Sequence, residues 1–400
     1  MAPLLEPRDE ADVVALVADA RAARTRLAVR GRGTRTALGR PTETDATVSL
    51  AALTGITLYE PAELVMTARA GTPLAEIRVA LAAHGQELAF DPIEHTALFG
   101  HAPGAGSIAA AFAINAAGPK RPKVGAARDH LLGFRAVNGL AESFKSGGRV
   151  MKNVTGFDLS KLVCGSFGTL GLLTEVTFKV LPRPETEATI AFLDLDDAAG
   201  CALLREASGL PQEVAALARL PASASPFAGR SATLLRLDGP AVSVASRRDD
   251  LLALWKATAP AEILDADASR DLWARIREAE PVAGHGGPVW RVSVAPTDGP
   301  RLVAALAESG PAPTAVAYDW TGGLVWLAFA PDSGPIAARL RAHVDRLGGH
   351  ALLVRACEAE RRAEAVFHPQ PAPLAALAAR VKRAFDPDGL FEPGRMTEGV

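Results

Sequence analysis

Residues 147–182 hold the feature that most constrains the fold of this chain. Six glycines, Gly147, Gly148, Gly156, Gly165, Gly168 and Gly171, precede a run from Leu172 to Val180 that is typical of a β-strand. Glycine lets the main chain approach a flat or anionic ligand without interference from Cβ atoms. Successive free N–H groups in such loops form concavities that bind anions. The segment therefore predicts a loop that carries a large phosphate-bearing cofactor, followed by a β-strand that ends at Pro182.

Positive charge gathers in the same part of the chain. The 400 residues carry a net charge of −2, which gives no reason to expect nucleic acid or an acidic membrane surface as a partner. From His101 to Pro182, however, ten Lys or Arg residues stand against four Asp or Glu, and thirteen of the 36 glycines lie between Gly100 and Gly171. A local positive field over bare main chain is suited to a diphosphate.

The cysteines and histidines indicate which cellular compartment the protein occupies and whether it binds a metal. The three cysteines have neither metal-ligand spacing nor the pattern of a disulfide framework, which favours a reducing compartment. The eight histidines are scattered, so we expect no metal site. The first residues carry acids where a signal peptide carries basic residues, and no apolar run approaches about 18 residues. We expect a cytoplasmic protein without direct membrane insertion, peripheral to the inner membrane only through partner subunits.

Two further glycine segments are open to more than one interpretation. Gly31-Arg32-Gly33-Thr34 follows a predicted strand, Leu27 to Arg30, but lacks the spacing of a dinucleotide fingerprint and of a P-loop. Alone it indicates a tight turn, whereas the second glycine cluster and the basic zone favour a phosphate cradle. Residues 104–118 are either a second main-chain platform or a small-residue helix packed in a core, and Lys120, Arg121 and Arg128 are either ligand-facing or a solvated face.

Residues 182–184, Pro-Arg-Pro, form the expected domain boundary, because the pattern of predicted strands and helices changes there. Before it, we expect a helix over 7–26 that Asp9 caps, then short strands. Beyond it, predicted strands and helices alternate, which indicates an α+β domain with an antiparallel sheet. Trp273, Trp290, Trp320 and Trp326 are expected in the core of this second domain, with a flavin-facing position for one or two of them as the alternative.

The chain resembles the FAD-binding flavoproteins typified by vanillyl-alcohol oxidase and p-cresol methylhydroxylase, and within them the FAD-binding subunits of bacterial glycolate oxidases. The resemblance covers nearly the whole chain. It is strongest in GGRVMKNVTGFDLSKL and GSFGTLGLLTEVTFKVLP, both within residues 147–182. Further matching motifs, in order, are Arg128-Asp129 with Leu132-Gly133, then Tyr318-Asp319-Trp320 with Gly322-Gly323, and finally Phe385-Asp386-Pro387 with Pro393-Gly394-Arg395.

The resemblance implies an α+β fold with a two-subdomain FAD-binding domain of the p-cresol methylhydroxylase (PCMH) type over 1–184. It also implies a cap domain over 185–360 and a C-terminal segment over 361–400 that returns to the FAD domain. The residues implied to bind FAD are Arg30, Gly31, Arg32, Gly33, Thr34, Arg35, Thr36, Pro103, Gly104, Gly106, Ser107, Ala110, Gly118, Arg128, Asp158, Gly165, Gly168, Thr169, Gly171 and Leu172. Of these, 31–36 would form the first diphosphate loop, and Leu172 would lie near the flavin ring.

The chain departs from this family pattern in three places. Relatives with covalently attached flavin have a histidine in the first loop, whereas Arg32, Thr34 and Arg35 flank Gly33 here, so noncovalent FAD is expected. Related 2-hydroxy-acid dehydrogenases have a histidine-rich metal motif in the cap, and the comparable segment 318–323 has no histidine. Glu392 replaces the usual asparagine before Pro-Gly-Arg, which predicts an additional acid near the flavin.

The function implied by the resemblance is that of the FAD-binding subunit of a glycolate oxidase-like complex. The complex would oxidise glycolate, or D-lactate, to the 2-oxo acid by hydride transfer to flavin, with a larger flavin subunit and an iron–sulfur subunit as partners. Arg149 and Lys152 are the candidate groups near the flavin or a substrate carboxylate. Two alternatives stay open: a non-catalytic FAD-binding subunit that relays electrons or supports assembly, and a free-standing flavin-dependent alcohol oxidase.

Overall fold

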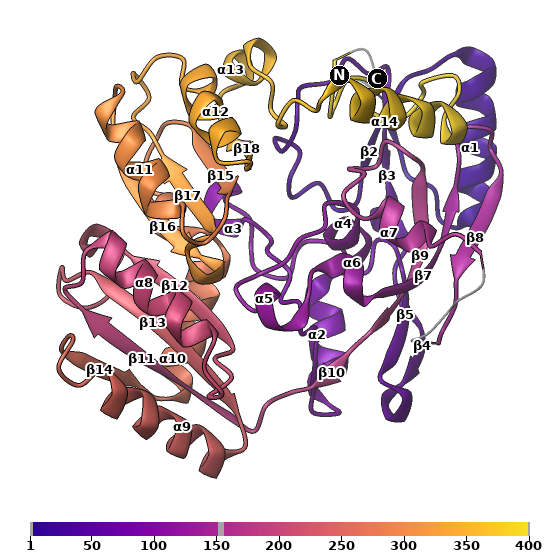
Figure 1. The fold of residues 1–400 in the computed structure, drawn as a ribbon. Coiled ribbons are helices and arrows are strands. Elements are labelled where there is room, and N and C mark those ends of the chain that lie inside the picture. Colours follow the sequence, from indigo (N-terminus) through magenta and orange to yellow (C-terminus); the bar gives the residue numbers. More distant parts are fainter. Residues whose placement is uncertain (1–2, 151–155, 399–400) are drawn as a thin grey trace. The chain divides into compact units, whose positions relative to one another are not determined.

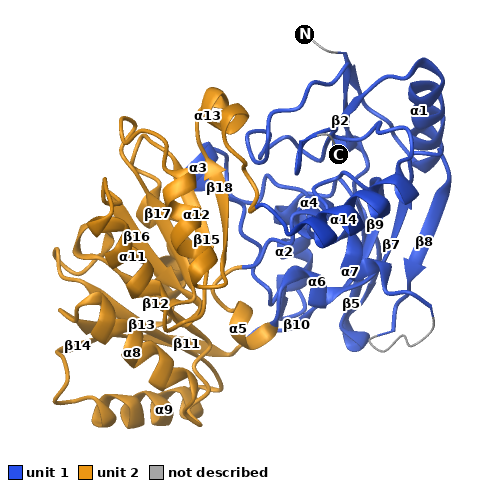
Figure 2. Cartoon of the chain, turned by 45° about the horizontal axis from the view of Figure 1, so that its top comes forward, with its two compact units in different colours: residues 1–117, 125–183, 369–400 blue, residues 118–124, 184–368 orange. Residues whose placement is uncertain are grey.

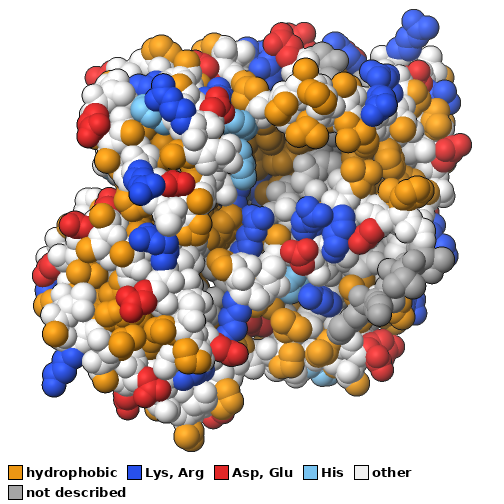
Figure 3. Space-filling model, in the orientation of Figure 1, with side chains coloured by type: hydrophobic (Ala, Val, Ile, Leu, Met, Phe, Trp, Pro, Cys, Tyr) orange, Lys and Arg blue, Asp and Glu red, His pale blue; other side chains and the backbone are white. Residues whose placement is uncertain are grey.

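The computed structural model describes residues 3–150 and 156–398, which form two compact units (Figure 2). Unit 1 comprises Met1–Ala117, Gly125–Arg183 and Pro369–Val400, and unit 2 comprises Gly118–Val124 and Pro184–His368. The functional domain limits at 184 and 360 stay a prediction. Figure 3 shows Lys and Arg side chains interspersed with Asp and Glu over the face in view, as the small net charge of −2 requires.

Unit 1 contains two main sheets (Figure 1). A parallel three-stranded sheet has the order β1 (Leu4–Leu5), β3 (Ala46–Ser49), β2 (Leu27–Arg30). An antiparallel five-stranded sheet has the order β4 (Ile56–Glu60), β5 (Val65–Arg69), β9 (Leu172–Lys179), β7 (Leu131–Val137), β8 (Ser143–Gly147). A short ribbon pairs β6 (Gln86–Glu87) with β10 (Leu181–Pro182). The helices are α1 (Glu10–Ala23), α2 (Leu74–Ala82), α3 (Thr96–Phe99), α4 (Ile108–Ala113), α6 (Ala127–His130), α7 (Leu159–Val163) and α14 (Ala372–Phe385).

Local sequence signals account for the start of this unit. The Asp9 side chain accepts the N–H of Asp12 at 2.8 Å and caps α1. Val13 and Val17 on α1 are fully buried in the core of unit 1. Strand β9 is buried along most of its length because it lies between β5 and β7 in the sheet. These elements bring the end of β2 and the loop before β9 into the same unit.

Unit 2 is built on one antiparallel eight-stranded sheet. Its order is β14 (Ala261–Leu264), β11 (Thr186–Leu193), β13 (Ala232–Gly239), β12 (Ala216–Leu220), β16 (Ala315–Asp319), β17 (Leu324–Ala328), β15 (Val289–Ser293), β18 (His350–Arg355). The helices are α5 (Arg121–Val124), α8 (Asp197–Ser208), α9 (Ala241–Leu254), α10 (Ala266–Arg277), α11 (Gly299–Glu308), α12 (Ala337–Arg346) and α13 (Glu358–Ala363). The expected α+β fold with an antiparallel sheet in the second domain is confirmed.

The tryptophans of unit 2 differ in their burial. Trp273, Trp290 and Trp326 are buried, as expected for core residues. Trp320 is only partly buried, because it lies in the turn between β16 and β17 rather than within a strand. Among the described residues, no helix is both long enough and apolar enough to cross a membrane.

Candidate cofactor site

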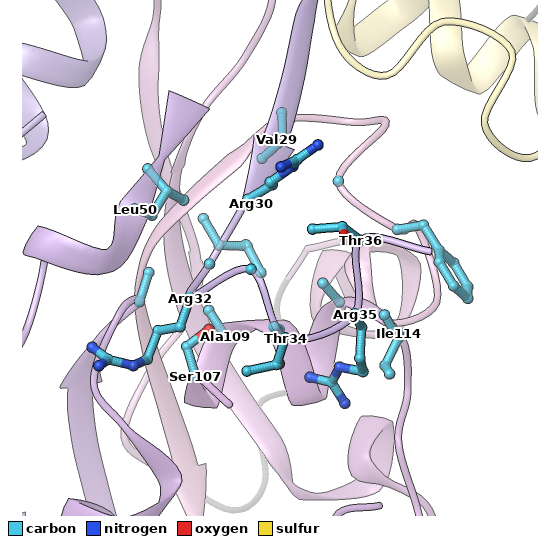
Figure 4. A pocket seen from close by; sticks show the side chains of 18 of the residues that line it. Val29, Arg30, Arg32, Thr34, Arg35, Thr36, Leu50, Ser107, Ala109 and Ile114 are labelled. Atoms are coloured by element: carbon cyan, nitrogen blue, oxygen red, sulfur yellow. The ribbon is translucent and has the colours of Figure 1, made fainter. Parts of the chain in front are cut away.

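A cavity is lined entirely by residues of unit 1. Its walls come from the end of β2 and the loop after it, from α4 with its capping residue Ser107, and from the loop before β9. Figure 4 shows Arg32, Thr34 and Arg35 of the first loop beside Ser107 and Ile114, which flank α4. All three glycine segments identified in the sequence therefore contribute walls to one cavity, the second of them through Ser107 and α4.

The first loop comes directly after β2, and its conformation requires glycine at two positions. Gly33 has φ = +72°, and a Cβ atom there would meet no protein atom within 4 Å, so it would project into open space. A Cβ on Gly31 would lie 2.1 Å from Ser107 Oγ. The loop can therefore lie against α4 and leave its main chain open to the cavity only because both residues lack a side chain.

The charge around the cavity is positive. Four arginines line it, Arg30, Arg32, Arg35 and Arg395, and its described lining contains no Asp or Glu. Arg32 Nε donates to Ala105 O at 3.0 Å, and Arg35 Nη1 donates to Ile93 O at 3.0 Å. The Arg32 hydrogen bond goes to a neutral carbonyl group, so it orients the guanidinium group without cancelling its charge. The cavity is consequently suited to an anionic ligand.

Ser107 provides a second indication of a polar ligand. Ser107 is 1% exposed, and its Oγ has no hydrogen-bond partner in the described part of the chain. A buried hydroxyl without a partner costs about 1–3 kcal/mol. Because Ser107 lines the cavity, a bound group with a polar atom at this point would relieve that cost. The arginines, the open loop and this hydroxyl fit a cofactor with phosphate groups.

Glu392 does not place a free negative charge in the cavity. The residue is 1% exposed, and its carboxylate accepts the Val29 N–H at 2.8 Å and a hydrogen bond from Arg395. Arg395 Nη2 also donates to Leu38 O at 3.0 Å. The acid expected near the flavin site is therefore neutralised by the arginine three residues later. Together, the two side chains attach the C-terminal segment to β2 and to the loop that follows it.

Gly104 and Gly106, the first glycines of the second segment, lie outside the cavity lining and are held by an acid that sequence reasoning missed. Glu94 is 3% exposed, and its carboxylate accepts the N–H groups of Gly104 at 3.0 Å and Gly106 at 3.1 Å. Arg78 Nη1 donates to the same carboxylate at 2.7 Å. The Gly104 and Gly106 amides thus bind a carboxylate of the chain itself. The only sequence signal for it was an acid about ten residues before the glycines.

The third loop contains two consecutive residues in the left-handed region, Phe167 at φ = +55° and Gly168 at φ = +79°. The Phe167 N–H donates to Ala113 O at 3.0 Å, which ties the loop to the end of α4. A Cβ on Gly168 would lie 3.4 Å from Val29 Cβ. The loop therefore packs closely against both of the other walls of the cavity.

The same loop is anchored to the C-terminal segment by a buried ion pair. Lys382 Nζ donates to Thr169 O at 2.7 Å, to Asp386 Oδ2 at 2.6 Å and to Phe391 O at 2.8 Å. Burial lowers the pKa of the Lys382 amino group, while the charge of Asp386 acts in the opposite direction. Asp386 in turn accepts the N–H groups of the two residues that end the tail turn, Leu390 and Phe391. This network fixes the tail and the loop together.

The structure brings eleven of the predicted cofactor residues to the cavity: Arg30, Gly31, Arg32, Gly33, Thr34, Arg35, Thr36, Ser107, Ala110, Gly168 and Gly171. The others do not line it: Pro103, Gly104, Gly106, Gly118, Arg128, Asp158, Gly165, Thr169 and Leu172. Leu172 is fully buried in the core, and Asp158 borders a different cavity. Gly118 belongs to unit 2, where its carbonyl accepts a hydrogen bond from Trp320.

The two candidate catalytic residues are not in the cavity lining. Arg149 is exposed after β8, and Lys152 lies outside the described residues. Lining residues that sequence reasoning missed are Val29, Leu38, Leu50, Ala70, Ala109, Ala113, Ile114, Phe167, Leu173 and Arg395. Most of them are small or apolar, and adjacency to the glycine loops was their one signal in the sequence. No group of three or more His, Cys, Asp or Glu side chains suited to a metal ion occurs in the described ranges.

Comparisons with known proteins agree with this geometry. The family described as FAD binding domain matches residues 2–145. Glycolate oxidase subunit GlcE of Escherichia coli is 34% identical over 379 residues, which cover 93% of each chain. A D-lactate dehydrogenase of Archaeoglobus fulgidus is 29% identical over 201 residues, 50% of this chain and 43% of that protein. The solved structure of p-cresol methylhydroxylase with substrate bound has a TM-score of 0.71 at 13% identity and covers 99% of this chain and 88% of its own.

The fold is that of the PCMH-type FAD-binding proteins, and the cofactor is FAD. Within that class, the chain belongs to the family of FAD-linked oxidoreductases that includes glycolate oxidase subunit GlcE.

Proposed function

We propose that this chain is the FAD-binding subunit of a glycolate oxidase-like complex. The complex oxidises glycolate, with D-lactate as the second candidate, to the corresponding 2-oxo acid. The observation that carries the proposal is the arginine-lined cavity of unit 1, which is free of acids along its described lining, in a chain 34% identical to GlcE over nearly its full length. The D-lactate dehydrogenase relative supports the class of substrate, a small 2-hydroxy acid.

The residues proposed to hold FAD are the eleven predicted ones that line the cavity. The N–H groups of the 31–36 loop and the surrounding arginines would bind the diphosphate, and Ser107 Oγ would supply a hydrogen bond. The described lining contains no histidine or cysteine, which supports noncovalent attachment. When bound, FAD supplies the oxidant: it takes up the hydride from the carbon that bears the hydroxyl group, while the hydroxyl proton is lost and the 2-oxo acid forms.

The proposed partners are a larger flavin subunit and an iron–sulfur subunit. Three cysteines in the whole sequence are too few to supply the four thiolates of an ordinary iron–sulfur cluster. Burial raises the pKa of both Cys164 and Cys201 to about 12, so neither thiol is a ready thiolate ligand. Electrons from the reduced cofactor would therefore leave through another polypeptide. The description of the E. coli relative as a subunit supports this arrangement.

The experiment that tests the proposal is an anaerobic visible spectrum of the full chain before and after glycolate is added. The spectrum is recorded for the chain alone and for the chain co-expressed with the two partner subunits. Bleaching in both samples would place oxidation on this polypeptide. Bleaching in the complex alone would favour the relay or assembly role. Bleaching by other alcohols but not by glycolate would contradict the proposal and favour a free-standing alcohol oxidase.

A further inference from the structure

Two guanidinium groups converge on one tryptophan in unit 2. Trp320 lies in the 3-10 turn Trp320–Gly322 between β16 and β17. The Arg121 Cζ atom lies 4.4 Å from the centroid of the Trp320 ring, and the Arg291 Cζ atom lies 4.8 Å from it. The Trp320 Nε1 atom donates to Gly118 O at 3.1 Å, which fixes the orientation of the ring. Two cations on a single ring exceed what is needed to hold one tryptophan in place.

The sheet register adds His350 to this group. On β15, Arg291 pairs with Leu352 of β18, and Ser293, two residues further along, pairs with His350. Because alternate residues of a strand point to the same face of a sheet, Arg291 and His350 lie on one face as diagonal neighbours. The residues of β15 that alternate with them, Trp290 and Val292, belong to the buried core on the opposite face.

The group formed by Arg121, Arg291 and His350 lies in a predominantly positive environment. Burial, together with the nearby charge of Arg121, lowers the pKa of Arg291 to about 10. Burial and the charges of Arg291, His368 and Arg121 lower the pKa of His350. The nearby charge of Asp319 acts in the opposite direction and raises the pKa of Arg291. The Asp319 Oδ1 atom also accepts the Trp320 N–H at 2.7 Å. Within the described part of the chain, the Arg291 side chain makes no hydrogen bond or ion pair.

The turn that holds Trp320 is strained. Trp320 has φ = +49° and Thr321 has φ = +67°, and Gly322 follows at φ = +91°. The left-handed conformation costs a residue with a side chain about 1–2 kcal/mol. Such strain persists where the surrounding structure enforces it, and it concentrates at binding sites. Here it presents the Trp320 ring to both arginines, instead of letting the ring enter the core as Trp290 does.

We propose that Arg121, Arg291 and His350, arranged around Trp320, bind the carboxylate of a small organic acid. The planar guanidinium group is suited to gripping a carboxylate with two parallel hydrogen bonds. A partly buried arginine that forms no direct ion pair, such as Arg291, costs desolvation energy that a bound anion would offset. A purely structural stack would explain the contact of Arg121 with the ring, but not a second arginine on the same ring that forms no direct ion pair. The choice of glycolate as the carboxylate rests on the proposed function.

The test is isothermal titration of the full FAD-loaded chain with glycolate and with its neutral analogue glycolamide. Arg291→Gln removes the charge but keeps a polar side chain. Arg301→Gln is the matched control, because Arg301 is 76% exposed in the same unit and pairs only with Asp298. We expect the dissociation constant for glycolate to rise roughly 10- to 100-fold in Arg291→Gln and to stay unchanged in Arg301→Gln. Glycolamide should not bind to any of these proteins.

A second variant protects the test from a folding failure. Arg121→Gln lies in the short helix α5 rather than in the sheet, and it should weaken glycolate binding by a similar factor. The FAD content of each variant is measured from the visible spectrum. Unchanged glycolate affinity in both folded variants, or no glycolate binding by the wild-type chain alone or in its complex, would overturn the carboxylate site. FAD binding and flavin reduction by glycolate would report separately on the proposed function.

Discussion

Replacement of Gly33 by leucine tests whether the unit 1 cavity is the FAD site. The residue lines the cavity at φ = +72°, and a Cβ there would meet no atom within 4 Å. The only cost to folding is therefore the left-handed conformation, about 1–2 kcal/mol. The new side chain would occupy space that the cofactor needs. If displacement costs about 1–3 kcal/mol, as overpacking does, the dissociation constant for FAD rises roughly 5- to 150-fold.

Gly85→Leu is the matched control for this experiment. Gly85 lies in the same unit at φ = +63°, a Cβ on it would also meet no atom within 4 Å, and it does not line the cavity. Both variants should lose the same amount of stability in thermal or urea unfolding. Only Gly33→Leu should lose FAD affinity, measured by titration of the apoprotein with FAD and quenching of flavin fluorescence. Equal FAD affinities in the two variants would refute the placement of the cofactor against the 31–36 loop.

Unit 1 supports three further predictions. Lys382→Met leaves the Asp386 carboxylate buried without its cation and should cost about 3–5 kcal/mol in urea unfolding; a loss below about 1 kcal/mol would contradict the anchoring role of the pair. The main cause that lowers the pKa of Glu10 is a hydrogen bond from Arg135. The stabilisation that this pair gives the folded state is therefore present above pH 4.5, the ordinary pKa of the carboxyl group, and is lost as pH falls through the lower folded-state pKa. Glu10→Gln should therefore flatten the loss of stability between pH 5 and pH 3, and an unchanged acid profile would argue against this linkage. Gly168→Val introduces a β-branched side chain at φ = +79° against Val29 and should abolish FAD retention, whereas full retention in the folded variant would refute contact between this loop and the cofactor.

The local parts of the cofactor site could be predicted from the sequence because glycine reports main-chain conformation directly. The 31–36 loop and Gly168 were identified in this way, whereas Ser107 was implied by the family resemblance, and the structure brings them together. The α+β fold followed from the alternation of strand-like and helix-like segments, with Asp9 marking the start of α1. These signals arise within a few residues of each other, so they need no knowledge of tertiary contacts.

Long-range contributions to the site could not be predicted in the same way. Arg395 reaches the cavity from a segment more than 350 positions after the 31–36 loop, and its pairing with Glu392 neutralises the acid expected near the flavin. Glu94 was missed because a buried acid that accepts main-chain N–H groups looks, in the sequence, like any surface acid. The surroundings of Trp320 depend on sheet register and on two distant arginines, so the sequence indicated a core or flavin-facing tryptophan but not its contact with these arginines.

The most direct test of the central claim is the flavin content of the purified full chain. The chain is saturated with FAD, freed of excess by gel filtration, and then denatured, and the released flavin is measured by its visible absorption. We predict about one FAD per chain, all of it released on denaturation, because the described lining of the cavity offers no histidine or cysteine for a covalent bond. A folded chain that retains no flavin after saturation, or flavin that stays attached after denaturation, would contradict the account.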